Sequence, residues 1–326
     1  DGDKMSKSKG NILDPLDLID GIELEALVEK RTTGLMQPAL APQIDAATRR
    51  QFPDGIPAYG TDALRFTFCS LATTGRDIRF DLARIQGYRN FCNKLWNAAR
   101  FVLMNTEDKS TQGDVELGLA ERWIVSLQQT VIQQVRDAIA QYRFDHAAQA
   151  IYEFVWNEYC DWFVELAKTN LNADETSPAA RGTRVTLISV LESILRLSHP
   201  LIPYISEEIW QRVAALAGKE VTTIMLQPYP EPELARMDRA VLDEMAWVKG
   251  FVLGIRQIRG EMNISPSKSV PILAQHGDLE DRKRLDANRD YLVALAKVST
   301  IEWLDDATPP PQSSMALLGE LKLYIP

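Results

Sequence analysis

Apolar residues recur every three or four positions along most of the chain after residue 61, the spacing of a buried face on an α-helix. This pattern predicts long helical stretches over residues 84–103, 120–142, 144–168, 177–216 and 238–262. Proline cannot continue a helix, so we expect a break in the fourth stretch at His199-Pro200. The 144–168 stretch is apolar on two sides, as expected at the centre of a bundle. We therefore predict a mainly α fold with an antiparallel helical bundle.

The segment before the bundle is more irregular. Asp14 is a candidate N-cap for a short helix, with Pro15 at its first position and Gly21 as its stop. Residues 21–60 carry Gly and Pro at short intervals, which predicts an insertion-rich region rather than a core.

The segment after Pro266 alternates between apolar and polar residues. This predicts strands near 270–274 and 300–304 around one helix at 279–297, then a Pro-rich linker and a last strand from Leu321. We expect a small α/β appendage here. The predicted domains are residues 1–82, 83–245 and 246–326.

Composition limits the possible functions. The chain has 326 residues, 45% of them apolar, and no apolar run long enough to cross a membrane. Its three cysteines are far apart, which argues against a disulfide framework or a cysteine-rich metal site and predicts a reducing, cytoplasmic compartment. The net charge of −9 argues against general nucleic-acid binding but allows a local basic face.

A cationic motif begins the chain: Lys4-Met5-Ser6-Lys7-Ser8, followed by Lys9-Gly10-Asn11. Lysines on a flexible loop can hold a polyphosphate whose charge redistributes as a bond breaks. From spacing alone, a solvated basic loop is the simpler explanation.

The motif resembles the second signature of the class I aminoacyl-tRNA synthetases, and it matches without a departure. Other segments are similar to the valine, isoleucine and leucine branch, among them Gly60–Phe66, Gly75–Ile78, Arg89–Ala98 and Trp156–Trp162. The run from Gly87 to Asn105 resembles the valine-specific members of the family most. The resemblance covers essentially the whole chain.

The resemblance implies a role in ATP-dependent activation of an amino acid. ATP, with Mg²⁺, would be a substrate bound by Lys4, Met5, Ser6, Lys7 and Ser8, with Lys4 and Lys7 as the catalytic lysines. No metal site and no structurally bound cofactor are implied. The family's H-x-G-H signature is not in this sequence, so we expect a fragment that is inactive without N-terminal catalytic and editing domains.

A local basic segment is the candidate RNA interface. Residues 76–104 hold six basic and two acidic side chains, opposite in sign to the whole chain. Cations, amides and aromatic rings off the apolar seam suit phosphates and unstacked bases. The resemblance implies that this helical domain reads the anticodon arm of a transfer RNA specific for valine. The predicted RNA-binding residues are Arg84, Arg89, Asn90, Lys94, Asn97, Arg100, Phe101, Trp162 and Val164.

Within this set, Phe101 is expected to be an exposed aromatic residue, and Trp162 and Val164 to complete a base pocket. Arg181 and Arg184 are weaker candidates for backbone contacts, because a solvated helix face explains them nearly as well.

Two alternatives remain open at this stage. One is an isoleucine-specific member of the same family, because the amino-acid pocket is not in this sequence. The other is a helical module that binds protein rather than RNA. We expect a monomer that does not contact a membrane.

Overall fold

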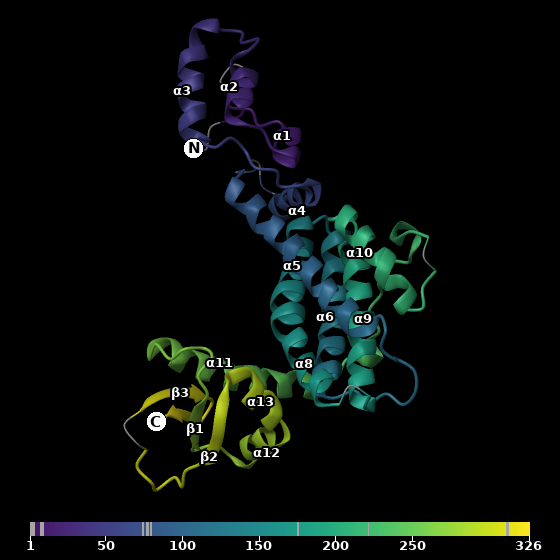
Figure 1. Cartoon of the computed structure of the whole chain (residues 1–326), viewed down its shortest axis with the longest axis vertical. Helices are drawn as coiled ribbons and strands as arrows, with labels where there is room; N and C mark the ends of the chain where they lie inside the picture. Colours follow the sequence, from purple (N-terminus) through teal and green to yellow (C-terminus); the bar gives the residue numbers. More distant parts are fainter. Residues whose placement is uncertain are drawn as a thin grey trace. The chain divides into compact units, whose positions relative to one another are not determined.

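The computed structural model describes residues 4–6, 10–73, 75, 78, 80–174, 176–220, 222–310 and 313–326 (Figure 1). The chain forms two compact units. The first holds residues 1–101, 131–156 and 191–230, and the second holds residues 102–130, 157–190 and 231–326. Long helices contribute residues to both units, and each unit is described by itself.

The elements in chain order confirm a mainly α fold with a small sheet. The α-helices are α1 Pro15–Asp20, α2 Leu24–Thr32, α3 Ala41–Gln51, α4 Thr61–Leu71, α5 Leu82–Thr106, α6 Leu119–Ala140, α7 Phe144–Glu153, α8 Val164–Ala173, α9 Pro178–Ser198, α10 Pro203–Leu216, α11 Arg239–Glu261, α12 Leu279–Ala287 and α13 Arg289–Ala296. The other helices are η2 Pro38–Leu40, the π-helix η3 Phe154–Phe163, η4 Ile224–Leu226 and η5 Leu234–Arg236. The strands are β1 Val270–Gln275, β2 Val298–Trp303, β3 Ser314–Leu318 and β4 Leu321–Ile325.

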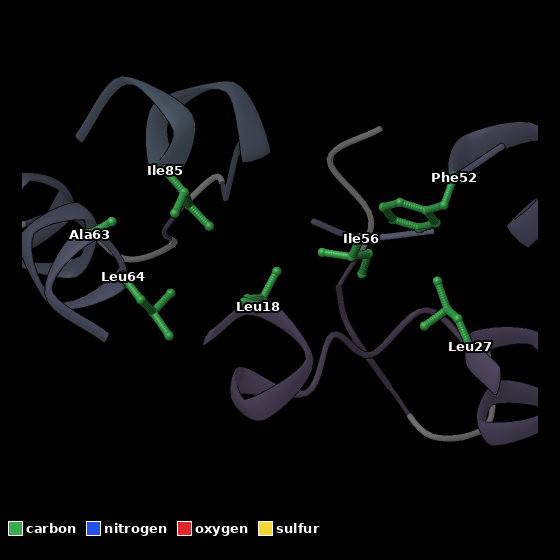
Figure 2. Close-up of a cluster of buried hydrophobic side chains, with 7 residues drawn as sticks. All are labelled: Leu18, Leu27, Phe52, Ile56, Ala63, Leu64 and Ile85. Carbon is green, nitrogen blue, oxygen red and sulfur yellow. The ribbon is translucent and has the colours of Figure 1, made fainter. Parts of the chain in front are cut away.

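The start of the first unit has its own small core, contrary to the prediction for residues 21–60. Leu27, Phe52 and Ile56 from this region are buried with residues from α1, α4 and α5 (Figure 2). The glycines and prolines here serve turns rather than marking the absence of a core. At Gly55, φ is +75° and a Cβ would lie 2.3 Å from the carbonyl oxygen of Ile22.

A buried carboxylate joins α4 to the start of α10 in the first unit. Asp62 accepts hydrogen bonds from the backbone N–H groups of Tyr204 (3.3 Å) and Ile205 (2.7 Å). These N–H groups lack partners within their own helix, so Asp62 caps α10 from a distant part of the sequence. Burial raises the pKa of Asp62, and the two N–H bonds oppose that rise. The predicted break at His199-Pro200 is confirmed, because α9 ends at Ser198 and α10 begins at Pro203.

The predicted helix over residues 144–168 is divided into three parts. The π-helix η3 lies between α7 and α8. In the second unit, its Tyr159 is completely buried and donates a hydrogen bond to the carbonyl oxygen of Leu187 at 3.0 Å. A π-helix is defined by hydrogen bonds from each N–H to the carbonyl five residues earlier. The spacing of apolar residues does not reveal this bonding, so the π-helix could not be predicted from the sequence.

The second unit contains a four-stranded sheet of order β2-β1-β4-β3. Strands β1 and β2 are parallel, while β4 is antiparallel to both β1 and β3. The last predicted strand is therefore half of a hairpin, which turns at Gly319 with φ +60°. The single helix predicted over 279–297 is two helices, α12 and α13, that meet at Asn288.

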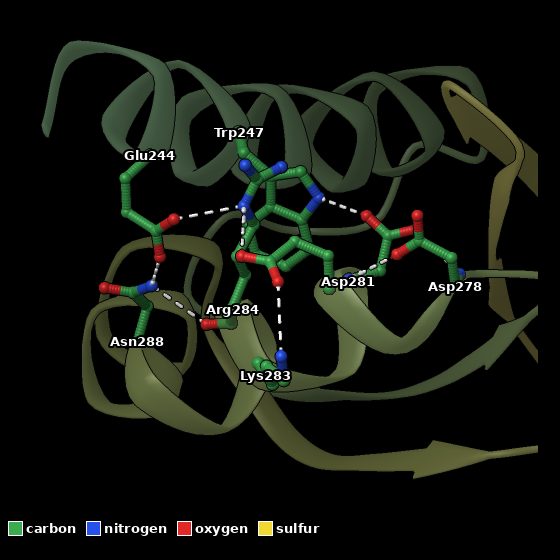
Figure 3. A network of polar contacts seen from close by, with 8 residues as sticks. Glu244, Trp247, Asp278, Asp281, Lys283, Arg284 and Asn288 are labelled. Atoms are coloured by element: carbon green, nitrogen blue, oxygen red, sulfur yellow. Dashed lines mark hydrogen bonds and ion pairs between the residues drawn. The ribbon is translucent and has the colours of Figure 1, made fainter. Parts of the chain in front are cut away.

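Polar contacts attach α12 to α11 in the second unit (Figure 3). The indole N–H of Trp247 donates to Asp281 at 2.7 Å. Glu244 accepts from Arg284 Nε at 3.0 Å and from Asn288 Nδ2 at 2.6 Å. Asp281 is also the N3 residue of the capping box at the start of α12, so one side chain serves both the cap and the contact between helices.

No helix among the described residues is long and apolar enough to span a membrane.

We expect Gly182→Ala to destabilise the protein. Alanine in place of glycine inside a helix usually stabilises by about 1 kcal/mol, but here the new Cβ would lie 1.9 Å from the carbonyl oxygen of Glu116. The clash should reverse the sign and cost about 1–3 kcal/mol, as overpacking usually does. Urea unfolding followed by circular dichroism measures this change in the free energy of unfolding. Gly87→Ala in α5, where the Cβ meets open space, is the control that should gain stability, and equal midpoints for the two variants would contradict the prediction.

We expect Asp62→Ala to lower the melting temperature, because two N–H groups at the start of α10 lose their acceptor. Loss of a helix N-cap typically costs about 1–2 kcal/mol. Differential scanning calorimetry measures the change, with exposed Asp243→Ala as the control. A variant that melts with the wild type would show that Asp62 does not stabilise α10.

Candidate nucleic-acid interface

The first unit includes residues 82–101 of α5, and this stretch separates an apolar side from a polar side. Ile85, Phe91 and Leu95 are completely buried. Five of the predicted RNA-binding residues are exposed on the same stretch: Arg84, Arg89, Asn90, Asn97 and Arg100. Arg89 and Arg100 make the exposed side of α5 basic on an acidic chain, whereas Arg84 is exposed at the first turn, in line with the buried Phe91.

Lys94 is half-buried and lies on an aromatic ring. Its Nζ is 4.0 Å from the centre of the Trp156 ring, within the range of a cation–π contact. The rings of Trp156 and Tyr152 stack at 5.6 Å with an interplanar angle of 13°, and Tyr152 also contacts Phe91 at 5.3 Å. The polar side of α5 is thus joined to half-buried rings from α7 and η3.

Sequence reasoning did not single out Tyr152 and Trp156 as interface residues. It assigned both to an apolar side of a central helix. The available signal was an aromatic pair four residues apart, but only the fold places that pair beside Lys94.

Asn90 and Asn97 offer amide groups beside the cations. The side-chain oxygen of Asn90 accepts from Gln86 Nε2 at 3.1 Å. This contact fixes the orientation of the Asn90 amide and leaves its N–H groups exposed. An exposed amide can form hydrogen bonds with the edge of a base.

Three of the predicted residues are less accessible than expected. Phe101 is half-buried rather than exposed. Trp162 and Val164 belong to the second unit and are only 8% and 7% exposed. Trp162 is covered by Lys249 and Arg256, each about 5.3 Å from its ring. The expectation that Trp162 and Val164 complete a base pocket is corrected, because their side chains pack within the protein.

The lysine-rich loop at the start of the chain is described in part. Lys4 and Met5 are exposed, and Lys7 and Ser8 lie outside the described residues. The side chain of Asn11 accepts the Ser6 N–H at 2.8 Å and donates to the Lys4 carbonyl oxygen at 3.3 Å. Asn11 thereby fixes the backbone at Lys4 while leaving the ammonium group in solvent.

Gly10 follows this loop in a left-handed conformation, with φ +60°. A Cβ at this position would lie 2.6 Å from Ile44 Cδ1. Glycine is therefore needed both for the turn and for the close approach to α3.

Two family models match the chain. Residues 1–81 match tRNA synthetases class I (I, L, M and V), and residues 121–274 match the anticodon-binding domain of tRNA ligase. The exposed side of α5 lies between the two matched ranges.

Known proteins that are similar to the chain include a tRNA ligase and a solved synthetase complex. Valine–tRNA ligase of Acinetobacter baylyi is 51% identical over 330 aligned positions, which cover 100% of this chain and 34% of that protein. The chain therefore spans about a third of the length of this curated relative. The crystal structure of the LeuRS–tRNA–LeuAMS ternary complex from Agrobacterium radiobacter K84 matches with a TM-score of 0.44 and 18% identity, over 87% of this chain and 28% of that chain.

The two family models cover both the lysine-rich loop and most of the helical bundle, and the identity to the ligase extends over the whole chain. The chain therefore carries a segment of the class I tRNA synthetases of the I, L, M and V group, followed by the anticodon-binding domain of a tRNA ligase.

Proposed function

We propose that the chain is the C-terminal part of a valine–tRNA ligase. The observation that carries this proposal is the 51% identity to such a ligase across the whole chain. The parent protein would join valine to its tRNA with ATP and Mg²⁺ through a valyl-adenylate, as a cytoplasmic monomer. The chain alone would bind RNA without catalysing the reaction. A protein-interaction module is not favoured, because both matched family models describe tRNA ligases.

Within this proposal the exposed side of α5 binds the anticodon arm of tRNA(Val). Arg84, Arg89 and Arg100 would hold phosphates, because guanidinium groups match phosphate oxygens in geometry. Asn90 and Asn97 would read base edges. Lys94 and Phe101 complete the surface beside the rings of Tyr152 and Trp156, where an unstacked base could stack.

The proposal assigns the lysine-rich loop to ATP. Lys4 and Lys7 would neutralise phosphate charge as pyrophosphate leaves, and Met5, Ser6 and Ser8 would line the nucleotide. The contacts of Asn11 with Lys4 and Ser6 support a defined loop backbone at its first residues. The proposed boundaries remain residues 1–82, 83–245 and 246–326.

The first test measures RNA binding by the chain. We expect a fluorescein-labelled anticodon hairpin of tRNA(Val) to bind with an affinity that falls by about 0.7–0.9 log units per log unit of salt for each phosphate contacted. Removing one phosphate contact by Arg100→Ala should reduce that salt slope by about 1. Fluorescence anisotropy at several salt concentrations measures both quantities.

The matched control is Arg212→Ala, which removes an exposed cation from α10 of the same unit. An equal loss of affinity for Arg100→Ala and Arg212→Ala would mean that only net charge matters and that α5 is not the interface. The hairpin of tRNA(Ile) tests the isoleucine-specific alternative, and preference for that hairpin would exclude valine specificity.

The second test uses the full-length ligase that contains this chain. We expect Lys4→Ala to slow valine-dependent exchange of pyrophosphate into ATP by about 100- to 1,000-fold, the usual effect of removing one transition-state donor. Binding of the anticodon hairpin should not change, because the lysine would contact only the nucleotide. Exposed Arg50→Ala is the control. Unchanged exchange in the Lys4 variant would refute the role of Lys4 in ATP activation.

A further inference from the structure

An open cavity of about 160 Å³ lies in the second unit, where the loop after α5 meets the start of α9. Its walls are formed by Asp108, Lys109, Ser110, Thr176, Arg181 and Arg184. Three of these are cations and one is a carboxylate, so the walls carry a net charge of +2. A water molecule occupies about 30 Å³ in the liquid, so the space holds several waters or one phosphate group.

Arg184 is built into the floor of this cavity. Its side chain is only 3% exposed. Nε donates to the carbonyl oxygen of Asn105 at 3.1 Å, and Nη1 contacts that of Ser110 at 3.5 Å. A guanidinium has five N–H donors, and Nη2 of Arg184 has no acceptor among the described residues. A largely buried guanidinium with an unused N–H donor is well suited to bind an anionic acceptor in addition to these carbonyl oxygens.

Arg181 lies one helical turn before Arg184, and its Nη2 has no hydrogen-bond acceptor among the residues that the structure describes. Its Nε donates to the carbonyl oxygen of Asp114 at 2.8 Å, and its Nη1 donates to that of Thr176. These carbonyl contacts fix both guanidinium groups without neutralising them. Neutral acceptors therefore hold both guanidinium groups. Hydrogen bonds from Thr176, and then the nearby charge of Arg181, lower the pKa of the Asp174 carboxyl, so part of the Arg181 charge is already balanced.

The backbone around the cavity is also specialised. Gly182 lies between the two arginines, and Glu116 of the loop approaches so closely that no side chain would fit. The N–H of Glu116 donates to the carbonyl oxygen of Pro178 at 3.1 Å, which attaches the loop to the first turn of α9. The positive end of the α9 dipole lies at this turn and favours an anion there.

We propose that this cavity binds a phosphate group, held by the guanidinium groups of Arg181 and Arg184 and by the ammonium group of Lys109. Ser110 and Thr176 line the walls, but their hydroxyl hydrogens are already donated to the Gln112 carbonyl oxygen and to the Asp174 carboxylate. The Asp108 carboxylate offsets part of the positive charge, so the three cations carry the attraction for phosphate. The same chemistry would accept a phosphodiester of an RNA backbone or a free phosphate ion. The phosphate site is formed by residues of the second unit alone and does not depend on the proposed ligase activity.

The test is titration calorimetry of the full chain with sodium phosphate and with pyrophosphate at constant ionic strength, since screening would otherwise mask the effect. We expect saturable binding that Lys109→Gln weakens by about tenfold, equal to about 1.4 kcal/mol. Lys109 is exposed, so its replacement should not disturb the fold. Exposed Lys283→Gln, in the same unit, is the matched control and should bind as the wild type does.

Arg181→Gln is the second variant, and circular dichroism checks that it is folded. It should weaken phosphate binding by at least as much as Lys109→Gln does. Competition with the labelled anticodon hairpin distinguishes the two sources of phosphate. Hairpin release by pyrophosphate in the wild type, but not in Lys109→Gln, would assign the site to RNA, whereas phosphate binding without competition would assign it to a free ion. Absence of saturable binding, or equal affinity in the wild type and in both variants, would overturn the proposal.

Discussion

Helix α5 buries one side only, and the complete burial of Ile85, Phe91 and Leu95 decides which side that is. Rotating the helix would place arginines among apolar neighbours, where an unpaired charge is very costly. The same packing therefore holds the exposed cations together. A basic surface on a chain of net charge −9 is thus a consequence of how the core is filled.

Much of the fold could be predicted because helix periodicity and capping are local properties. Asp14 caps α1 and Gly21 follows it, as the residue pattern predicts, and α11 begins within one residue of the expected position. The π-helix escaped prediction because its i→i+5 hydrogen bonds change the helical period too little over ten residues for the apolar spacing to reveal it. The small core at the start of the chain was not predicted, because closely spaced Gly and Pro are typical of irregular segments, whereas here they shape the turns between buried residues such as Leu27 and Phe52.

The candidate interface was predictable only where it depends on a single helix. Helical spacing is enough to place Arg89, Asn97 and Arg100 off the apolar seam, and they are exposed. Phe101 is half-buried and Trp162 is buried, because their surroundings are set by residues distant in sequence. For the same reason the contact of Lys94 with Trp156, and the cavity beside Arg184, have no signature in the sequence.

The position of Lys94 over Trp156 has a consequence for the thermodynamics of association. A free lysine side chain loses about 1.5–2 kcal/mol of rotamer entropy when it is immobilised. Here the Trp156 ring already restricts the ammonium group before any ligand binds. The entropy of ordering the lysine side chain is therefore lost during folding rather than during binding. Pre-organisation of this kind leaves more of each new contact as net affinity.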